Sequence, residues 1–250
     1  MLKKLIFTLA LLALFAMIGF TSLLLVGGMD FQSAGAREEK AAAPNSEAST
    51  MKTRRKVAIF IHEVVELLDF SGPGEVFAST DHRQAFEVYT VAASPDEIVS
   101  QGFVTIKPQY TFANCPPPDI VILPGGRTDV PLSDAAVIKW IKDSSQKAEV
   151  VMSVCTGAFL LAKAGLLDGR EATTHWSAIA SLRQEAPKTT VRENRRFVDN
   201  GKVITAAGVS AGIDASLHVV DKLLGREAAE KTAHYMEYKW QPESDSEKSR

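Results

Sequence analysis

The chain has 250 residues, of which 46% are apolar and 23% charged, a composition that excludes a wholly disordered or fibrous protein. Its 28 Lys and Arg residues against 30 Asp and Glu residues give a net charge of −2, so no basic excess points to nucleic acid as a partner. Two cysteines, Cys115 and Cys155, are too few for a disulfide framework or a cysteine-rich metal cluster. These numbers leave a globular α/β or α+β domain, either an enzyme or a binding protein.

The first element in chain order is an uncharged apolar stretch over residues 5–26, preceded by Lys3 and Lys4. It is long enough to cross a bilayer as a helix, and it is longer than the usual apolar core of a signal peptide. We therefore expect a membrane anchor, with the two lysines in the cytoplasm and the rest of the chain facing the periplasm or cell exterior. Three alternatives stay open: secretion after cleavage at the small residues 34–36, translation starting at Met51, and a buried core helix.

Composition divides the chain into four segments. Residues 1–28 form the anchor or signal segment, and residues 29–54, rich in Ala, Ser and Glu, are expected to be a disordered tether. Residues 55–240 contain no internal repeat and no second linker, so they are expected to fold as one domain. The polar residues 241–250 are expected to be a disordered tail.

Short apolar runs rich in β-branched residues alternate with helical patterns across the domain, which predicts a parallel sheet covered on both faces. The predicted strands cover residues 56–62, 86–92, 119–124 and 149–154, and an Asn200-Gly201 turn predicts a β-hairpin within residues 195–205. The predicted helices, with the residues that begin or end them, are 73–80 (Ser71 as cap, Pro73 in the first turn), 134–146 (Ser133 as cap), 156–164 (ending at Gly165), 211–224 and 226–240. The predicted fold class is α/β, a doubly wound parallel sheet with one β-hairpin.

Two strand–turn–helix junctions place a nucleophile at the apex, and the later one contains Ser210. Residues 208–212 match the G-x-S-x-G pattern of serine hydrolases, but the acidic residues and histidines that follow lie within helical runs. A tight turn from a strand into a helix explains the two glycines equally well. Ser210 is therefore not favoured as a nucleophile.

The earlier junction, at Cys155, is the stronger candidate, because its neighbours can activate a thiol. In such sheets ligands bind at the carboxyl ends of the strands, where this junction lies. Cys155 ends a buried strand and is followed by Thr156 at the amino end of a helix, whose dipole and free N–H groups favour the thiolate. The Thr156 N–H and a second donor from the Gly125-Gly126 turn are expected to face an anion that forms on a carbon bonded to the sulfur. The alternative is a free cysteine buried in the core.

Three motifs give the chain a resemblance to a known family. They are ILPGG at residues 122–126, SVCTGAFLLAKAGLLDGREATTHW at 153–176 and LLDFSGPGEVF at 67–77. Together they resemble the DJ-1/PfpI family of the class I glutamine amidotransferase-like superfamily, over nearly all of residues 56–224. The resemblance implies a flavodoxin-like sheet. Within the family the motifs are most similar to the isonitrile hydratase branch, and they also resemble sensor-like domains of some AraC-type transcription regulators.

The resemblance assigns roles residue by residue. Cys155 corresponds to the family nucleophile, Thr156 and Gly126 to its oxyanion donors, and Asp69 to a general acid/base beside the sulfur. A carboxyl next to a thiolate has a raised pKa and can hold a proton near neutral pH; a capping or loop carboxylate is the alternative for Asp69. His175 resembles the family histidine near the nucleophile, although simple packing against the following tryptophan would explain it equally. The protease-like branch has His directly after Cys, where this chain has Thr156, so peptidase activity is not implied.

The sequence is expected to encode a cofactor-free enzyme with a small-molecule substrate, because it contains no nucleotide-binding motif and no metal-ligand spacing. The hydratase resemblance implies that Cys155 attacks an isonitrile and that the resulting thioimidate is hydrated to an N-substituted formamide. Glyoxalase- or deglycase-like chemistry and a non-catalytic ligand- or redox-sensing domain are the alternatives. The resemblance also implies a homodimer.

Overall fold

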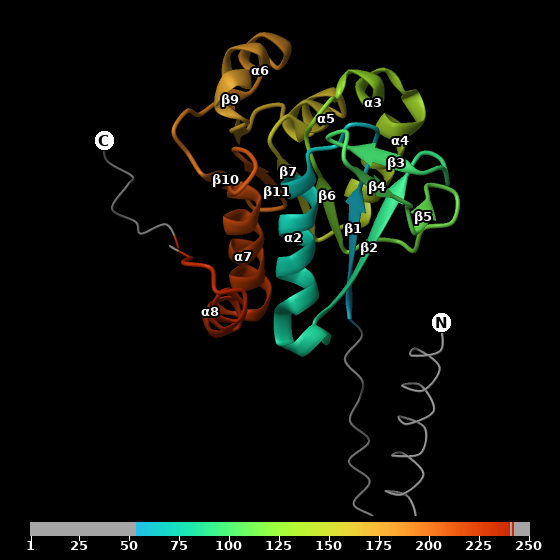
Figure 1. Ribbon diagram of the computed structural model, residues 1–250. Helices are drawn as coiled ribbons and strands as arrows, with labels where there is room; N and C mark the ends of the chain where they lie inside the picture. Colours follow the sequence, from blue (N-terminus) through green and yellow to red (C-terminus); the bar gives the residue numbers. More distant parts are fainter. Residues whose placement is uncertain (1–53, 241, 243–250) are drawn as a thin grey trace, which may run out of the picture. The chain divides into compact units, whose positions relative to one another are not determined.

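A seven-stranded sheet organises the domain (Figure 1), and the computed structural model describes residues 54–240 and 242. The strand order is β10-β11-β7-β6-β1-β2-β5, and every neighbouring pair is parallel except the β10–β11 hairpin. The strands are β1 (Arg55–Phe60), β2 (Phe86–Ala92), β5 (Tyr110–Thr111), β6 (Ile120–Leu123), β7 (Val150–Val154), β10 (Phe197–Asn200) and β11 (Val203–Ala206). The predicted α/β class, with a mostly parallel sheet and one hairpin, is confirmed.

Helices cover both faces of this sheet (Figure 1). On one face pack α2 (Leu67–Ser79), α7 (Ala211–Leu224) and α8 (Arg226–Tyr235); on the other pack α4 (Ala135–Lys147), α5 (Gly157–Lys163) and α6 (Ile179–Glu185). Val57 of β1 belongs to the first core cluster and its neighbour Ala58 to the second, because successive strand residues point to opposite faces. Every residue of β6 and β7 is buried, which explains why these strands are apolar apart from Ser153 in β7.

The start of α2 differs from its prediction. The helix begins at Leu67 and contains Pro73 in its interior, and the Ser71 hydroxyl donates to the Leu67 carbonyl (2.7 Å) instead of capping a helix start. A Cβ on Gly72 would lie 3.0 Å from Ile213 of α7, so the two helices approach closely at this point. Tertiary packing therefore outweighs the preference of proline for a first turn. The earlier start of the helix, at Leu67, places Asp69 in the first turn of α2.

The cap of α4 also differs from its prediction. Asp134, not Ser133, caps this helix, since its carboxylate accepts from the Ala136 N–H (2.8 Å). Ser133 instead ends the preceding short helix α3 (Asp129–Ser133). Several further short elements have no sequence signal, because two to four residues make no recognisable period: β3 (Ile98–Ser100), β4 (Val104–Ile106), β8 (Glu171–Ala172), β9 (Thr190–Val191), η1 (Thr80–Arg83) and η2 (Trp176–Ala178).

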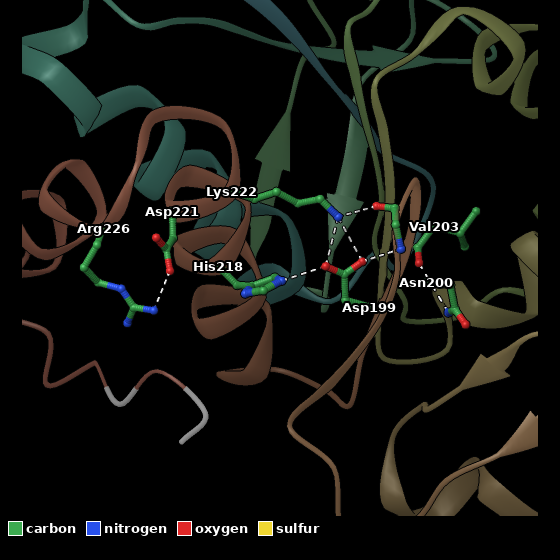
Figure 2. A network of polar contacts seen from close by, with 8 residues as sticks. Asp199, Asn200, Val203, His218, Asp221, Lys222 and Arg226 are labelled. Carbon is green, nitrogen blue, oxygen red and sulfur yellow. Dashed lines mark hydrogen bonds and ion pairs between the residues drawn. The ribbon is translucent and has the colours of Figure 1, made fainter. Parts of the chain in front are cut away.

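A polar network ties the β10–β11 hairpin to α7. Figure 2 shows Asp199 of β10 facing His218 and Lys222 of α7, which donate to its carboxylate at 2.8 Å and 3.0 Å. The Gly201 N–H donates to the same group (2.6 Å). Burial opposes ionisation of Asp199, but these donors outweigh it and lower the pKa of the carboxyl to about 2.

We expect Asp199→Asn to lower the free energy of unfolding at pH 7 by about 1–2 kcal/mol, because the ionised carboxylate is bound more strongly in the folded state. The folded pKa of about 2 lies below the ordinary value of 3.8, so this contribution is present above pH 4 and is lost as the pH falls through 2. Urea unfolding of both proteins between pH 7 and pH 2.5 checks it, with Asp143→Asn, an exposed partner of Lys139, as control. A stability difference that does not shrink on acidification would contradict the assignment.

The prediction of a membrane anchor needs correction. In residues 54–240 and 242, no helix is long and apolar enough to cross a membrane. The longest of these helices, α7, has 14 residues and spans about 21 Å, less than the ~30 Å apolar thickness of a bilayer. The apolar stretch 5–26 and the predicted segment 1–28 lie outside the described residues, as does nearly all of the predicted tether and tail. Because the described residues contain no such helix, the membrane anchor and the location outside the cytoplasm that followed from it are not retained.

Candidate active site

The predicted site residues gather at the carboxyl ends of four adjacent strands, β11, β7, β6 and β1. Asp69 lies in the first turn of the helix that follows β1, Gly125 follows β6, and Cys155 follows β7. The turn after β11 supplies Gly208 and Val209. The chain runs from β1 outward to β2 and then returns to β6 on the other side of β1, and this reversal of direction is where such sheets bind ligands.

Cys155 sits on the tight turn between β7 and α5. Its φ of +57° is unusual for a residue with a side chain, and its exposed fraction is 8%. The turn is fixed on both sides: the Cys155 N–H donates to the Ala206 carbonyl (3.2 Å), and the Thr174 hydroxyl donates to the Cys155 carbonyl (2.7 Å). A nucleophile elbow at Cys155 is therefore what the backbone forms.

Gly157 makes this elbow sterically possible. A Cβ at this position would lie 1.9 Å from the Leu123 carbonyl oxygen, a backbone atom that cannot rotate away. We expect Gly157→Ala to lower the free energy of unfolding by more than about 3 kcal/mol, since even overpacking of mobile side chains costs about 1–3 kcal/mol. The melting temperature should fall by about 6–12 °C.

The matched control is Gly74→Ala in α2, where a Cβ would meet only the end of the Ile59 side chain at 3.4 Å. Alanine also suits a helix better than glycine, so this control should keep the melting temperature or raise it. Equal effects of the two substitutions would contradict the close approach of α5 to β6.

Asp69 is wholly buried beneath this elbow. Its two carboxylate oxygens accept from the Gly125 N–H (2.9 Å) and from the Val209 N–H (3.0 Å). Burial and the nearby charge of Glu66 raise the pKa of Asp69 to about 7, and these two N–H groups and the Cys155 side chain limit the rise. The carboxyl can therefore both hold and release a proton near neutral pH, beside the sulfur. A surface or merely capping carboxylate does not fit this environment.

The expected low-pKa thiolate at Cys155 is wrong for this arrangement. Burial and the nearby charges of Asp69 and Glu66 raise the pKa of the Cys155 thiol to about 12, although the Thr156 N–H and hydroxyl group lower it. The helix that was expected to stabilise the thiolate, α5, has seven residues and so contributes a short dipole. With these pKa values the sulfur keeps its proton near neutral pH, where the Asp69 carboxyl exchanges its own.

The Gly125-Gly126 turn supports the site by close backbone approach. A Cβ on Gly125 would lie 2.6 Å from the Thr156 nitrogen, and one on Gly126 would lie 2.3 Å from the Val64 carbonyl oxygen. The Gly125 N–H is bound to Asp69, and the Gly126 N–H donates to the Thr156 hydroxyl oxygen (3.1 Å). That hydroxyl in turn donates to the Gly126 carbonyl (3.1 Å). Both amides are therefore engaged, whereas the Thr156 N–H is the backbone group that lowers the pKa of the Cys155 thiol.

His175 borders the same space as the sulfur. A Cβ on Gly208 would lie 2.7 Å from His175 Cδ2 and 3.5 Å from Cys155 Sγ, so both side chains flank this glycine. The His175 Nδ1 atom lies 2.8 Å from the Ser177 hydroxyl and accepts from the Ser177 N–H (3.4 Å). Trp176 is 81% exposed, so the two aromatic residues do not form a pair packed into the core.

Sequence reasoning found the turn at residues 208–212 but missed that its Val209 N–H is one of the two donors to Asp69. The signal was present in the G-x-S-x-G pattern, since its glycines mark a tight turn. Ser210 itself contacts the Arg196 guanidinium (3.3 Å) rather than a histidine. A neighbouring cleft of about 440 Å³ was also not predicted; it is lined by Thr174, Trp176, Ala207 and eight other residues. Over the part of the chain that the structure describes, no group of three or more His, Cys, Asp or Glu side chains could hold a metal ion.

Comparison with known proteins matches the DJ-1/PfpI family model to residues 55–222. Isonitrile hydratase of Pseudomonas putida is 34% identical over 192 residues, which are 76% of this chain and 82% of that protein. The HTH-type transcriptional regulator GbdR of Pseudomonas aeruginosa is 26% identical over 145 residues, 58% of this chain and 39% of the regulator. The crystal structure of a THiJ/PfpI family protein from Pseudomonas syringae is 30% identical and superposes with a TM-score of 0.69, covering 82% of this chain and 85% of that one.

Proposed function

The chain belongs to the DJ-1/PfpI family, and we propose that it is an isonitrile hydratase-like enzyme that converts an isonitrile and water into an N-substituted formamide. Cys155 is the nucleophile and Asp69 the general acid/base. The observation that carries the proposal is the wholly buried Asp69 carboxyl, which has a pKa of about 7 and lies close enough to the Cys155 thiol for its charge to raise the pKa of that thiol. The 34% identity to an isonitrile hydratase supports the choice of substrate class.

In the first step the Asp69 carboxylate takes the thiol proton while the sulfur bonds to the terminal carbon of the isonitrile. That carbon gains an electron pair and takes the proton back from Asp69, which gives a thioimidate and regenerates the carboxylate. The S–H bond is broken, and one C–S and one C–H bond are formed. This chemistry needs a proton carrier within reach of the sulfur, which is the position of Asp69.

In the second step the Asp69 carboxylate takes a proton from water as the water oxygen adds to the thioimidate carbon. The proton passes to the substrate nitrogen. The hydroxyl proton of the adduct then passes through Asp69 to the sulfur as the C–S bond breaks and the formamide leaves. The Thr156 N–H, which lowers the pKa of Cys155, stabilises the departing thiolate. His175, which borders the same space, is assigned the role of orienting the water.

The test is product formation by the full chain in water enriched in ¹⁸O. An aliphatic isonitrile should be converted to its formamide, with one ¹⁸O atom in the carbonyl group, as measured by mass spectrometry. Methylglyoxal, supplied in a parallel reaction, should not be consumed. Absence of labelled formamide above the buffer reaction would reject the hydratase proposal, and consumption of methylglyoxal would favour glyoxalase-like chemistry.

A sensing role is the second candidate, because the similarity extends to a transcriptional regulator over 58% of this chain. A sensor would bind a ligand, or have Cys155 oxidised, without turnover. A third reaction, with peroxide, distinguishes it from catalysis. A stable mass increase on Cys155 with peroxide, together with no product from the isonitrile or from methylglyoxal, would favour sensing.

A further inference from the structure

The turn at residues 207–210 holds three groups of the site in place. Its Val209 N–H donates to Asp69, and Gly208 lies against Cys155 and His175. Val209 has a φ of +48°, which is strained for a β-branched residue and persists only where the surrounding structure enforces it. Something outside the turn must therefore hold it in this conformation.

Arg196, which directly precedes β10, contacts both ends of this turn. Its carbonyl accepts from the Ala207 N–H (2.9 Å), and its guanidinium lies 3.3 Å from the Ser210 hydroxyl oxygen. The same guanidinium binds the Asp214 carboxylate through Nε (2.8 Å) and through Nη2. Asp214 lies in the first turn of α7, four residues after Ser210, so the turn is fixed to the helix that follows it.

Asp214 is buried, with an exposed fraction of 8%, and both of its carboxylate oxygens are engaged. One accepts from Arg196, and the other accepts from the Tyr238 hydroxyl (3.0 Å). A buried carboxylate needs such partners to stay in place. The network connects the segment after α8 with the turn that touches Asp69.

We propose that Arg196, Asp214 and Tyr238 are positioning residues that clamp the 207–210 turn, keep the Val209 N–H on the Asp69 carboxylate, and so set the pH at which Asp69 exchanges its proton. The proposal rests on the proposed function only in that Asp69 is the proton carrier for Cys155. If the clamp is lost, the strained turn relaxes and Asp69 loses one of its two N–H donors. Because an N–H donor favours the charged carboxylate, its loss moves the first ionisation of the Asp69–Cys155 pair to higher pH.

The experiment measures the rate at which iodoacetamide modifies Cys155 in the full chain between pH 5 and pH 9, with Cys115 distinguished by peptide mass spectrometry. Arg196→Met should move the midpoint of this profile upward by about half to one pH unit. Arg192→Met, which removes an exposed arginine paired with Glu171, is the matched control and should leave the midpoint unchanged. A clamp that serves stability alone would lower the melting temperature without moving the midpoint.

Tyr238→Phe keeps the experiment decisive if Arg196→Met fails to fold, since it removes a single hydroxyl. It should shift the midpoint in the same direction by a smaller amount. An unchanged midpoint in the folded Arg196→Met protein, or in Tyr238→Phe if that is the variant that folds, would overturn the proposal. Alkylation requires no isonitrile, so the two proposals can fail separately. A shifted midpoint in the variants, with no formamide made by the unmodified chain, rejects the hydratase function and keeps the clamp. Formamide production by the unmodified chain, with an unchanged midpoint in the variants, keeps the hydratase function and rejects the clamp.

Discussion

Cys155→Ala is expected to abolish formamide production. The C–S bond of the thioimidate cannot form without the sulfur, and removal of a catalytic nucleophile has cost up to about 10⁶-fold in other enzymes. We therefore expect a loss of at least about 10³-fold. The fold should persist, because alanine keeps the Cβ at the strained position (φ +57°) and removes only one buried atom. Substrate conversion and the melting temperature, measured on the same preparation, check both statements.

Cys115→Ala is the matched control for this prediction. Cys115 is the other free cysteine; it is partly buried and packs against the second core cluster. Its replacement should leave turnover within about twofold of the unmodified chain, because no step of the proposed reaction uses it. Turnover that survives in Cys155→Ala would reject covalent catalysis at this site and return attention to Asp69 acting on water alone.

The nucleophile elbow was predictable because its determinants are local. An apolar strand, Cys155, Thr156 and Gly157 follow each other in the chain, and the spacing alone describes a strand that turns into a helix. The partners of Asp69 are not local. Val209, which donates to it, is 140 residues away in the sequence, and no periodicity or spacing links the two. A carboxyl at residue 69 could be proposed from a resemblance, but its two donors could not.

The protonation of the site was predicted wrongly for a physical reason. A position at a helix start indicates a stabilised thiolate, whereas burial and a neighbouring charge depend on the folded chain. At Cys155 these two effects exceed the lowering by the Thr156 N–H and hydroxyl group at the start of the short helix α5. The fold shows the same division: the buried strands β6 and β7 were readable from their composition, whereas the position of Pro73 inside α2 depends on how that helix packs against α7.

Asp69→Asn is expected to reduce turnover by about 10²–10⁴-fold, the usual contribution of a general acid/base. The amide keeps the size of the carboxyl, but it cannot take the thiol proton and return it to carbon. Its single oxygen can accept only one of the two N–H groups from Gly125 and Val209, which destabilises the fold. Removal of a buried charge above pH 7 offsets this loss, because the raised pKa of Asp69 means that ionisation weakens the folded state as the pH rises from 4 to 7. The melting temperature at pH 8 should therefore change by only a few degrees.

In Asp69→Asn, the alkylation rate of Cys155 should change in the opposite direction from the turnover rate. The charge of Asp69 raises the pKa of the Cys155 thiol, so its removal lowers that pKa and should increase the rate of alkylation by iodoacetamide at pH 8, where Asp69 of the unmodified chain is ionised. A purely structural Asp69 predicts the opposite pattern, a clearly lower melting temperature with turnover little changed. A turnover loss below tenfold, or slower alkylation of Cys155 in a folded variant, would reject Asp69 as the proton carrier. Slow turnover combined with fast alkylation would show that the sulfur can still lose its proton to solvent, while the proton that the substrate carbon needs is no longer delivered.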